Sequence, residues 1–190
     1  MMLTTILAYS LILSYFVIER SLRKHSAALS LKAEANDRGS SRLILISGMI
    51  NIVLALLAPA LNAAKIGFWK LGYGCWLGLC LMLLGLALRA WAAITLDKLY
   101  TRTLRVSDRQ EIIDRAPYTL IRHPGYAGIS LLEIGAGLAV GNWLVLVLVA
   151  IIGLQSRLYR IEAEESMLLD ALPEYRAYQA RTWRLIPFVY

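Results

Sequence analysis

The chain has 190 residues, of which 58% are hydrophobic, and its formal net charge is +7. This hydrophobic fraction and a mean hydropathy of +0.58 exclude a water-soluble globular domain and a disordered chain. The excess of Lys and Arg lies beside apolar segments, where it orients a chain in a membrane, so we expect no nucleic-acid partner.

Four apolar stretches follow one another along the chain, at residues 3–18, 43–61, 71–96 and 129–154. The cations near the first stretch come after it, which argues against a cleaved signal peptide and for a retained span. The fourth stretch is long enough for one span or for a hairpin of two. Gly141-Asn142 in its middle is a pair typical of turns.

The distribution of Lys and Arg decides between these alternatives. Residues 19–42 and 97–122 hold six cations each, whereas the connection between the second and third stretches holds only Lys65 and Lys70. The C-terminal region carries five arginines, namely Arg157, Arg160, Arg176, Arg181 and Arg184. The positive-inside rule places all of these cations except the two lysines in the cytoplasm only if the fourth stretch is a hairpin.

We therefore predict an all-α integral membrane helical bundle that forms one domain over residues 1–190, with the N-terminus outside and the C-terminus inside. Its five spans are residues 3–18, 43–61, 71–96, 124–140 and 143–158, followed by a cytoplasmic tail at 159–190. Each arm of the hairpin covers only about 25 Å of a hydrocarbon core roughly 30 Å thick, so the bilayer is locally thin or the loops lie deep.

The tail and two charged residues within the spans complete the topology. Apolar and aromatic residues recur at steps of three and four in the tail, at Leu168, Leu172, Tyr175 and Tyr178. This spacing predicts an amphipathic helix at the membrane surface. Arg89 and Glu133 lie inside predicted spans, where an ionisable residue needs a partner or a function. We expect them to pair with each other, with contact between Glu133 and a polar acceptor as the alternative.

The segment from Tyr118 to Tyr126 is the first candidate site. Proline suits the first turn of a helix, so Pro124 predicts the start of the fourth span. The free N–H groups of that turn, with Arg122 and His123 just before it, favour binding of a carboxylate or phosphate. The alternative is that both side chains only anchor the chain at the membrane interface.

The second candidate site follows the fifth span. Arg160 and Glu164 are four residues apart and share one helical face, while Glu162, Glu164 and Glu165 place negative charge in one turn. Taken alone, this pattern is also typical of a solvated charged turn. The predicted topology brings both sites to the cytoplasmic feet of one hairpin, where a zwitterionic amino-acid group would fit between them. The two cysteines, Cys75 and Cys80, lack metal-ligand spacing, and we expect no metal.

These residues resemble a known family. Arg122-His123-Pro124-Gly125-Tyr126, a hydrophobic hairpin and Glu164-Glu165 are similar to the membrane methyltransferases related to isoprenylcysteine carboxyl methyltransferase and, more distantly, to phospholipid N-methyltransferases. The tail sequences from Leu172 to Tyr178 and from Arg184 to Pro187 resemble the same family. The similarity covers about the last 90 residues. The chain departs from the family where Gln110-Glu-Ile-Ile113 replaces a His-x-Leu-Val stretch and where Pro173 replaces a glycine.

The resemblance implies transfer of a methyl group from S-adenosyl-L-methionine to a lipophilic acceptor of the prenyl or lipid type. It places a substrate-orienting arginine at Arg160 and a cofactor contact at Glu164. We expect Arg160 to orient the acceptor's carboxylate or phenolate, Glu164 to hold the cofactor's amino group, and Arg122 and His123 at the helix start to hold its carboxylate. The cofactor-binding residues that the resemblance implies are Gln110, Ile113, Tyr118, Arg122, His123, Pro124, Gly125, Tyr126, Glu164 and Glu165, and the catalytic ones are Arg160 and Glu164.

Three other functions stay open at this point: a phospholipid-type N-methyltransferase, a membrane reductase with a nicotinamide cofactor, and a membrane scaffold without catalytic activity. The eukaryotic enzymes of the family have further N-terminal spans that this sequence lacks. We therefore expect a minimal form in a prokaryotic inner membrane, with the active site facing the cytoplasm. The charge distribution fixes that side of the membrane, whereas the acceptor's identity has no signal in the sequence.

Overall fold

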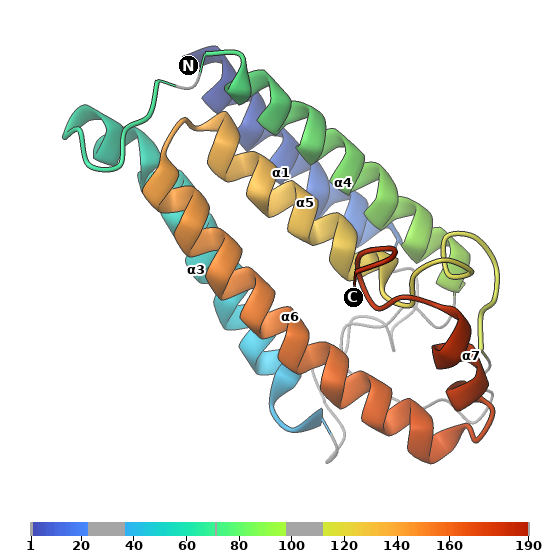
Figure 1. The fold of residues 1–190 in the computed structure, drawn as a ribbon. Helices are drawn as coiled ribbons and strands as arrows, with labels where there is room; N and C mark the ends of the chain where they lie inside the picture. Colours follow the sequence, from blue (N-terminus) through green and yellow to red (C-terminus); the bar gives the residue numbers. More distant parts are fainter. Residues whose placement is uncertain (1, 23–36, 71, 98–111, 190) are drawn as a thin grey trace.

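The structure is a computed structural model that describes residues 2–22, 37–70, 72–97 and 112–189. Its described residues form six helices: α1 (Met2–Leu22), α3 (Ser40–Ala63), α4 (Gly74–Leu96), α5 (Pro124–Ala139), α6 (Trp143–Ala171) and α7 (Tyr175–Arg181). Five long helices make an elongated bundle, and the short α7 lies at the end of the bundle where α6 finishes (Figure 1). The predicted all-α fold is confirmed.

The helices α1, α3, α4 and α6 are each long and apolar enough to cross a membrane. The protein is a multi-pass integral membrane protein. Helix α5 has 16 residues and is about 24 Å long, which is less than a hydrocarbon core of roughly 30 Å. The short fourth arm predicted from the sequence is therefore present as a helix.

The hairpin between α5 and α6 is confirmed, and Asn142 is its central residue. Gly141 has a φ of 63°, the left-handed conformation that glycine adopts without strain. The Asn142 side chain accepts a hydrogen bond from the backbone N–H of Val145 at 3.0 Å and so caps α6. Its amide nitrogen donates to Asn62 Oδ1 at 2.8 Å and to the Ile66 carbonyl at 2.9 Å. These bonds fix the turn against the end of α3.

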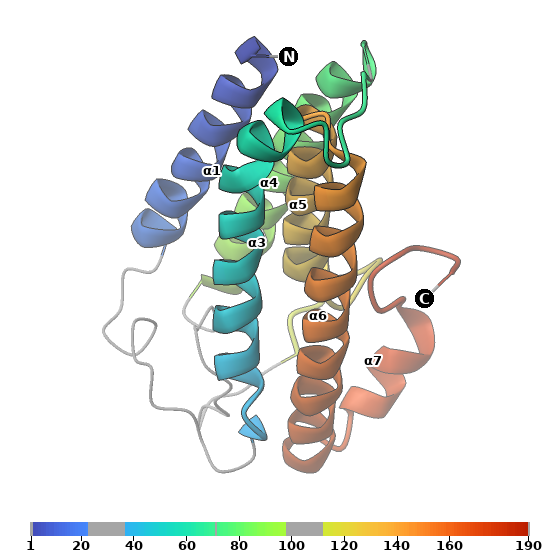
Figure 2. The same cartoon turned by 90° about the vertical axis from the view of Figure 1, so that its left-hand side faces the viewer.

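Four glycines bring α4 and α5 into backbone contact. Gly85 faces Gly128 and Gly78 faces Gly135, and a Cβ atom added at any of them would overlap backbone atoms of the other helix. The partners are spaced by seven residues on both helices, so both contacts fall on one seam. Small residues allow such close approach in membranes, where packing replaces the hydrophobic effect as the force between helices. The two helices lie side by side along their length (Figures 1 and 2).

Helix α6 packs on α3 through hydrogen bonds that cross the bundle. Ser47 donates to Ser156 Oγ at 2.9 Å, and Asn51 donates to the Val149 carbonyl at 3.3 Å. The views in Figures 1 and 2 both place the two helices next to each other. This contact aligns the beginning of α3 with the last turns of α6.

The tail departs from the prediction of one amphipathic helix after residue 158. Helix α6 continues to Ala171 and therefore includes Leu168, while Leu172 is extended, with φ −130° and ψ 97°. Pro173 disfavours helical backbone at the residue before it, which explains the break. Tyr175 and Tyr178 belong to the separate helix α7 and are buried. The polar half of α6 thus extends the hairpin and carries the candidate site.

The predicted ion pair between Arg89 and Glu133 is wrong. Arg89 Nε donates to Glu19 Oε1 at 2.7 Å, and Arg157 Nη1 lies 2.7 Å from Glu133 Oε2. Glu133 is two residues from Gly135 and hence about 200° around α5 from the seam with α4. It therefore faces α6, whose Arg157 becomes its partner. The glycine contacts between α4 and α5 set the rotation of α5 and therefore the direction in which Glu133 points.

Candidate functional site

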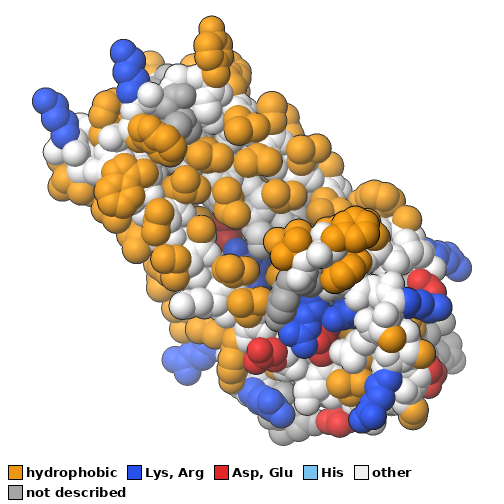
Figure 3. Space-filling view, viewed as in Figure 1, with side chains coloured by type: hydrophobic (Ala, Val, Ile, Leu, Met, Phe, Trp, Pro, Cys, Tyr) orange, Lys and Arg blue, Asp and Glu red, His pale blue; other side chains and the backbone are white. Residues whose placement is uncertain are grey.

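Most of the charged side chains visible in Figure 3 gather at the end of the bundle where α7 lies, below a largely hydrophobic surface. The start of α3, the start of α5 and the last turns of α6 meet at this end. Tyr126, Arg160, Glu164 and Glu165, which the sequence singled out on α5 and α6, lie in two adjacent polar networks there. One contains Glu164 and the other contains Glu165.

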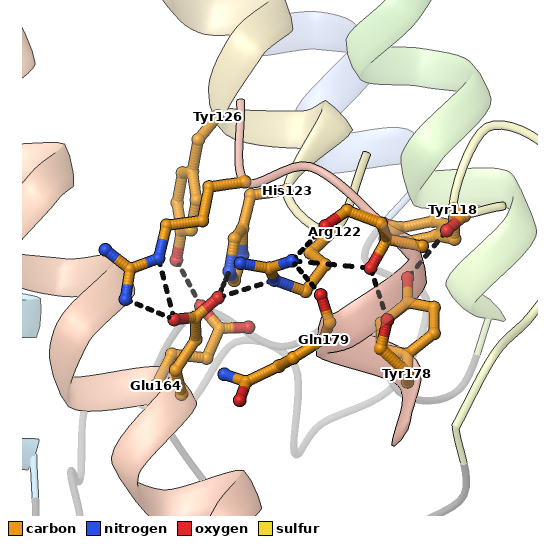
Figure 4. Close-up of polar contacts among 10 residues, drawn as sticks. Tyr118, Arg122, His123, Tyr126, Glu164, Tyr178 and Gln179 are labelled. Atoms are coloured by element: carbon orange, nitrogen blue, oxygen red, sulfur yellow. Dashed lines mark hydrogen bonds and ion pairs between the residues drawn. The ribbon is translucent and has the colours of Figure 1, made fainter. Parts of the chain in front are cut away.

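The first network joins Tyr126, Arg160 and Glu164. The Tyr126 hydroxyl donates to Glu164 Oε2 at 2.8 Å and accepts a hydrogen bond from Arg160 Nε at 3.1 Å. Figure 4 shows Tyr126 and Glu164 pointing toward each other from α5 and α6. Arg160 and Glu164 therefore share a face as predicted, but a tyrosine from the facing helix connects them.

The start of α3 supplies partners for Arg160 that the sequence did not reveal. Arg160 Nη1 donates to Asp37 Oδ1 at 2.8 Å, to Ser40 Oγ at 3.0 Å and to Ser41 Oγ at 2.6 Å. The run Asp37-Arg-Gly-Ser-Ser carries a signal for a turn and a helix start. Nothing in the sequence links it to an arginine more than a hundred residues later.

Two polar atoms of this network are available to hydrogen-bond a ligand, as far as the described residues show. Arg160 Nη2 and Glu164 Oε1 have no hydrogen-bond partner among those residues. Arg160 is only 5% exposed, and a buried charge is stable only when it is paired and hydrogen-bonded. Asp37 and Tyr126 satisfy that requirement while leaving one guanidinium nitrogen available.

The second network is centred on the buried carboxylate of Glu165. Arg122 Nε donates to Glu165 Oε1 at 2.7 Å, and His123 Nε2 lies 3.3 Å from the same oxygen. Arg184 approaches Glu165 Oε2 with Nε and Nη2, each at 2.9 Å. Arg122 Nη1 also donates to the backbone carbonyls of Gln179 and Thr182 (Figure 4). Glu165 therefore ties the beginning of α5 to α6 and to the C-terminal segment.

The beginning of α5 is less open than the sequence predicted. The Arg122 backbone N–H donates to the Trp183 carbonyl at 2.7 Å, and the His123 N–H donates to the Arg184 carbonyl at 3.1 Å. Pro124 is the first helical residue, as expected. Because the Arg122 side chain and these two amides are already bonded within the chain, anion binding at this point stays a prediction.

Two further predicted site residues, Tyr118 and Ile113, are described by the structure. Tyr118 is buried: its hydroxyl donates to the Ala92 carbonyl at 3.3 Å, and its own carbonyl accepts from the Tyr178 hydroxyl at 2.7 Å. Burial, aided by the charge of Asp114, raises the pKa of Tyr178 to about 12, so its phenol stays a donor. Ile113 is half-buried, and Gln110 lies outside the described residues.

Comparisons with known proteins agree with the residue pattern. The sequence profile of the isoprenylcysteine carboxyl methyltransferase (ICMT) family matches residues 76–170, which include Tyr126, Arg160 and Glu164 and end before α7. The chain is 28% identical over 138 residues to a "probable protein-S-isoprenylcysteine O-methyltransferase" from rice (Oryza sativa subsp. indica), covering 71% of this chain and 69% of the relative.

Another relative and a solved structure extend the similarity. The chain is 27% identical over 161 residues to protein-S-isoprenylcysteine O-methyltransferase B from Arabidopsis thaliana, covering 80% of this chain and 82% of that protein. The structure of the eukaryotic intramembrane Ras methyltransferase ICMT matches with a TM-score of 0.64 and 22% identity. That match covers 96% of this chain and 62% of the other, and it shows a shared fold. The chain belongs to the isoprenylcysteine carboxyl methyltransferase family, a family of S-adenosylmethionine-dependent methyltransferases.

Proposed function

We propose that this protein transfers the methyl group of S-adenosyl-L-methionine to the carboxylate of a lipophilic acceptor, with an isoprenylcysteine-type carboxyl group as the first candidate. The observation that carries this proposal is the buried guanidinium of Arg160, which keeps Nη2 without a partner among the described residues, beside the Tyr126–Glu164 hydrogen bond. The related plant proteins are named for isoprenylcysteine O-methylation.

Arg160 is the residue that would hold the acceptor. A guanidinium stays charged at all relevant pH values and donates hydrogen bonds to carboxylates in a fixed geometry. Arg160 projects from α6, which is apolar in its first half and polar in its second. An amphiphile in the bilayer could therefore place its hydrocarbon chain along the apolar half and its carboxylate at Arg160.

The residues around Glu164 fit the cofactor in chemical type. S-adenosyl-L-methionine carries an ammonium group, and Glu164 Oε1 is an anionic oxygen without a hydrogen bond among the described residues. When bound, the cofactor supplies an electrophilic methyl group on a sulfonium. We assign Glu164 to the ammonium and Tyr126 to orienting the Glu164 carboxylate. His123, Pro124 and Gly125 complete the cofactor side at the start of α5, and Tyr118 stays a further candidate.

The network around Glu165 has a supporting role in this proposal. Arg122, His123 and Arg184 all bind Glu165, so the start of α5 and the C-terminal segment hold fixed positions beside Glu164. Fixing two reactants in near-attack geometry can supply about 7–11 kcal/mol of a barrier. Because methyl transfer to a carboxylate needs no proton to be moved, positioning and exclusion of water are the main tasks of the protein.

We place this site at the cytoplasmic face of the membrane, with α5 crossing as the fourth of five spans. The support is the excess of Lys and Arg in residues 19–42, 97–122 and the C-terminal region over the connection that holds Lys65 and Lys70. The described ends of these cationic segments meet at the same end of the bundle as α7. An anionic acceptor also suits Arg160 better than an amine does, which favours O-methylation over N-methylation.

A ligand-induced stability measurement tests the proposal. S-adenosylhomocysteine added to the detergent-solubilised protein should raise its unfolding temperature in a concentration-dependent way, because binding to the folded state stabilises it. NADP should have no such effect, which would exclude the reductase alternative. Absence of any shift with S-adenosylhomocysteine, together with a shift by NADP, would overturn the assignment. The variant Glu164→Gln should reduce the S-adenosylhomocysteine shift, whereas Asp170→Asn, at an exposed carboxylate on the same helix, should retain it.

A further inference from the structure

The guanidinium of Arg160 is engaged on two of its three nitrogens. Nε donates to the Tyr126 hydroxyl at 3.1 Å. Nη1 has three oxygen neighbours on one short stretch at the start of α3, with Asp37 Oδ1 at 2.8 Å as the charged one. Nη2 is left for a ligand, because no described residue accepts a hydrogen bond from it.

This arrangement limits how a carboxylate can bind. Arginine normally holds a carboxylate with two parallel N–H···O bonds, from the edge formed by Nε and Nη2 or from the edge formed by Nη1 and Nη2. Each edge of Arg160 has one of its two nitrogens already engaged, by Tyr126 on one side and by Asp37 on the other. A carboxylate that meets this side chain therefore receives hydrogen bonds from Nη2 alone.

We propose that Asp37 is a positioning residue that restricts Arg160 to a grip on a single oxygen of the acceptor carboxylate and leaves the second oxygen free to receive the methyl group. This inference rests on the proposed function and deepens it. It makes the beginning of α3 part of the site and assigns Asp37 a role that acts through Arg160.

The chemical consequence concerns the nucleophile. A carboxylate held by two nitrogens has both oxygens in charge-assisted hydrogen bonds, which stabilises the ground state and withdraws electron density from the attacking atom. With one oxygen held, the other forms the O–CH₃ bond with its own lone pair while the S–CH₃ bond of the sulfonium donor breaks. The products are a methyl ester and a neutral thioether, and no proton has to be placed.

Hydrogen bonds from the start of α3 fix the Asp37 carboxylate beside Arg160. Asp37 is 3% exposed, and its carboxylate accepts hydrogen bonds from Ser40 Oγ at 2.9 Å, from Ser41 Oγ at 2.8 Å and from the Ser41 backbone N–H at 3.1 Å. Burial alone would raise the pKa of Asp37, but these bonds and the charge of Arg160 outweigh it and hold the pKa below its usual value. Asp37 thus stays ionised and keeps its hold on Nη1 at neutral pH.

The test uses Asp37→Ala and a prenylated carboxylate, N-acetyl-S-farnesylcysteine, with the full-length protein in detergent micelles. Equilibrium binding of this probe is measured in the presence of S-adenosylhomocysteine, and kcat and KM are measured with S-adenosyl-L-methionine. Removing Asp37 takes away the charged acceptor of Nη1 and leaves only the neutral hydroxyls of Ser40 and Ser41, with which a ligand carboxylate can compete for the Nη1 and Nη2 edge. We expect the Kd and KM of the probe to fall about tenfold, the effect of one charge-assisted hydrogen bond, and kcat to fall by more.

Three controls separate this effect from damage to the fold. The carboxamide of the same probe cannot bind as a carboxylate, so its Kd should not tighten in Asp37→Ala. Asp170→Ala removes an exposed carboxylate from the end of α6 and should leave all constants unchanged. If Asp37→Ala does not fold, Asp37→Asn replaces it, because the neutral amide competes less well for Nη1 and should shift Kd, KM and kcat in the same direction by a smaller factor.

The outcomes distinguish this inference from the proposed function. Tighter binding with slower turnover supports it. If the wild type methylates the probe but the Asp37 variant binds it with an unchanged or raised Kd, the single-oxygen grip is wrong and the proposed function stands. Failure of the wild type to methylate the probe, despite binding S-adenosylhomocysteine, overturns the carboxylate acceptor and this inference with it.

Discussion

Glu133 on α5 and Arg157 on α6 form a buried ion pair in the apolar part of the hairpin, with Oε2 and Nη1 2.7 Å apart. Gly153, one turn before Arg157, makes room for it, since a Cβ atom there would overlap both side chains. The two antiparallel helices are therefore joined electrostatically inside the bundle, between the turn at Asn142 and the network at Arg160.

Loss of one partner of this pair should destabilise the protein strongly. Glu133→Gln or Arg157→Gln leaves a buried charge without compensation, which costs about 3–5 kcal/mol. The measurement is the free energy of unfolding in detergent, or the unfolding temperature where unfolding is irreversible. The double reversal Glu133→Arg with Arg157→Glu should recover part of the loss. Recovery by Glu133→Arg with Arg89→Glu instead would contradict the pairing, because Arg89 binds Glu19.

The glycine seam between α4 and α5 should tolerate no side chain. Gly135→Ala places a Cβ against the backbone of Gly78, and overpacking of this kind costs about 1–3 kcal/mol. The matched control is Gly48→Ala on α3, where an added Cβ meets nothing within 4 Å. The control should be neutral or slightly stabilising, because alanine favours helix. Equal unfolding temperatures for both variants would show that the seam is looser than described.

Asp37 makes stability depend on pH in a defined direction. Its pKa is lower in the folded protein than its usual value of about 3.9, so its contribution to stability is complete above that value. The contribution is lost as the pH falls through the lowered pKa. Unfolding temperatures measured from pH 7 to pH 3 should therefore decrease less steeply at the acidic end for Asp37→Asn than for the wild type. Identical profiles would show that Asp37 is not held by Ser41 and Arg160.

Glu165 should control the attachment of the C-terminal segment. In Glu165→Gln the guanidinium groups of Arg122 and Arg184 lose their shared carboxylate. We expect trypsin to cleave after Arg181 and Arg184 faster than in the wild type, as followed by mass spectrometry. Asp114→Asn is the control. It removes an exposed ion pair with Arg181, and exposed pairs contribute only about 0–1 kcal/mol to the stability of the fold. Cleavage in that variant should match the wild type.

The sequence sufficed for features that depend on local pattern. Apolar stretches predicted the long helices, Gly141-Asn142 predicted the hairpin, and Pro124 predicted the start of α5. The spacing of Arg160 and Glu164 predicted a shared helical face. Each of these features follows from neighbouring residues and from the solvent around them, so no knowledge of the packing was needed.

Contacts between distant segments could not be predicted from local sequence patterns. The partner of Glu133 depends on how α5 is rotated, and the glycine seam with α4 fixes that rotation. The Asp37–Arg160 contact depends on the alignment of α3 with α6, which the Ser47–Ser156 bond and the turn at Asn142 set. Pro173 is a local signal for the break between α6 and α7. The three- and four-residue spacing of apolar residues in the tail favoured one continuous helix instead, and that prediction was wrong.

The most direct test of the proposed methyl transfer is the fate of a labelled methyl group. Purified protein is incubated with methyl-labelled S-adenosyl-L-methionine and N-acetyl-S-farnesylcysteine, and the product is treated with mild base. A carboxyl methyl ester releases volatile labelled methanol, and Arg160→Ala and Glu164→Ala should each abolish most of this release. Label that stays base-stable in the product, or release that is unchanged in both variants, would contradict carboxyl methylation at Arg160 and Glu164.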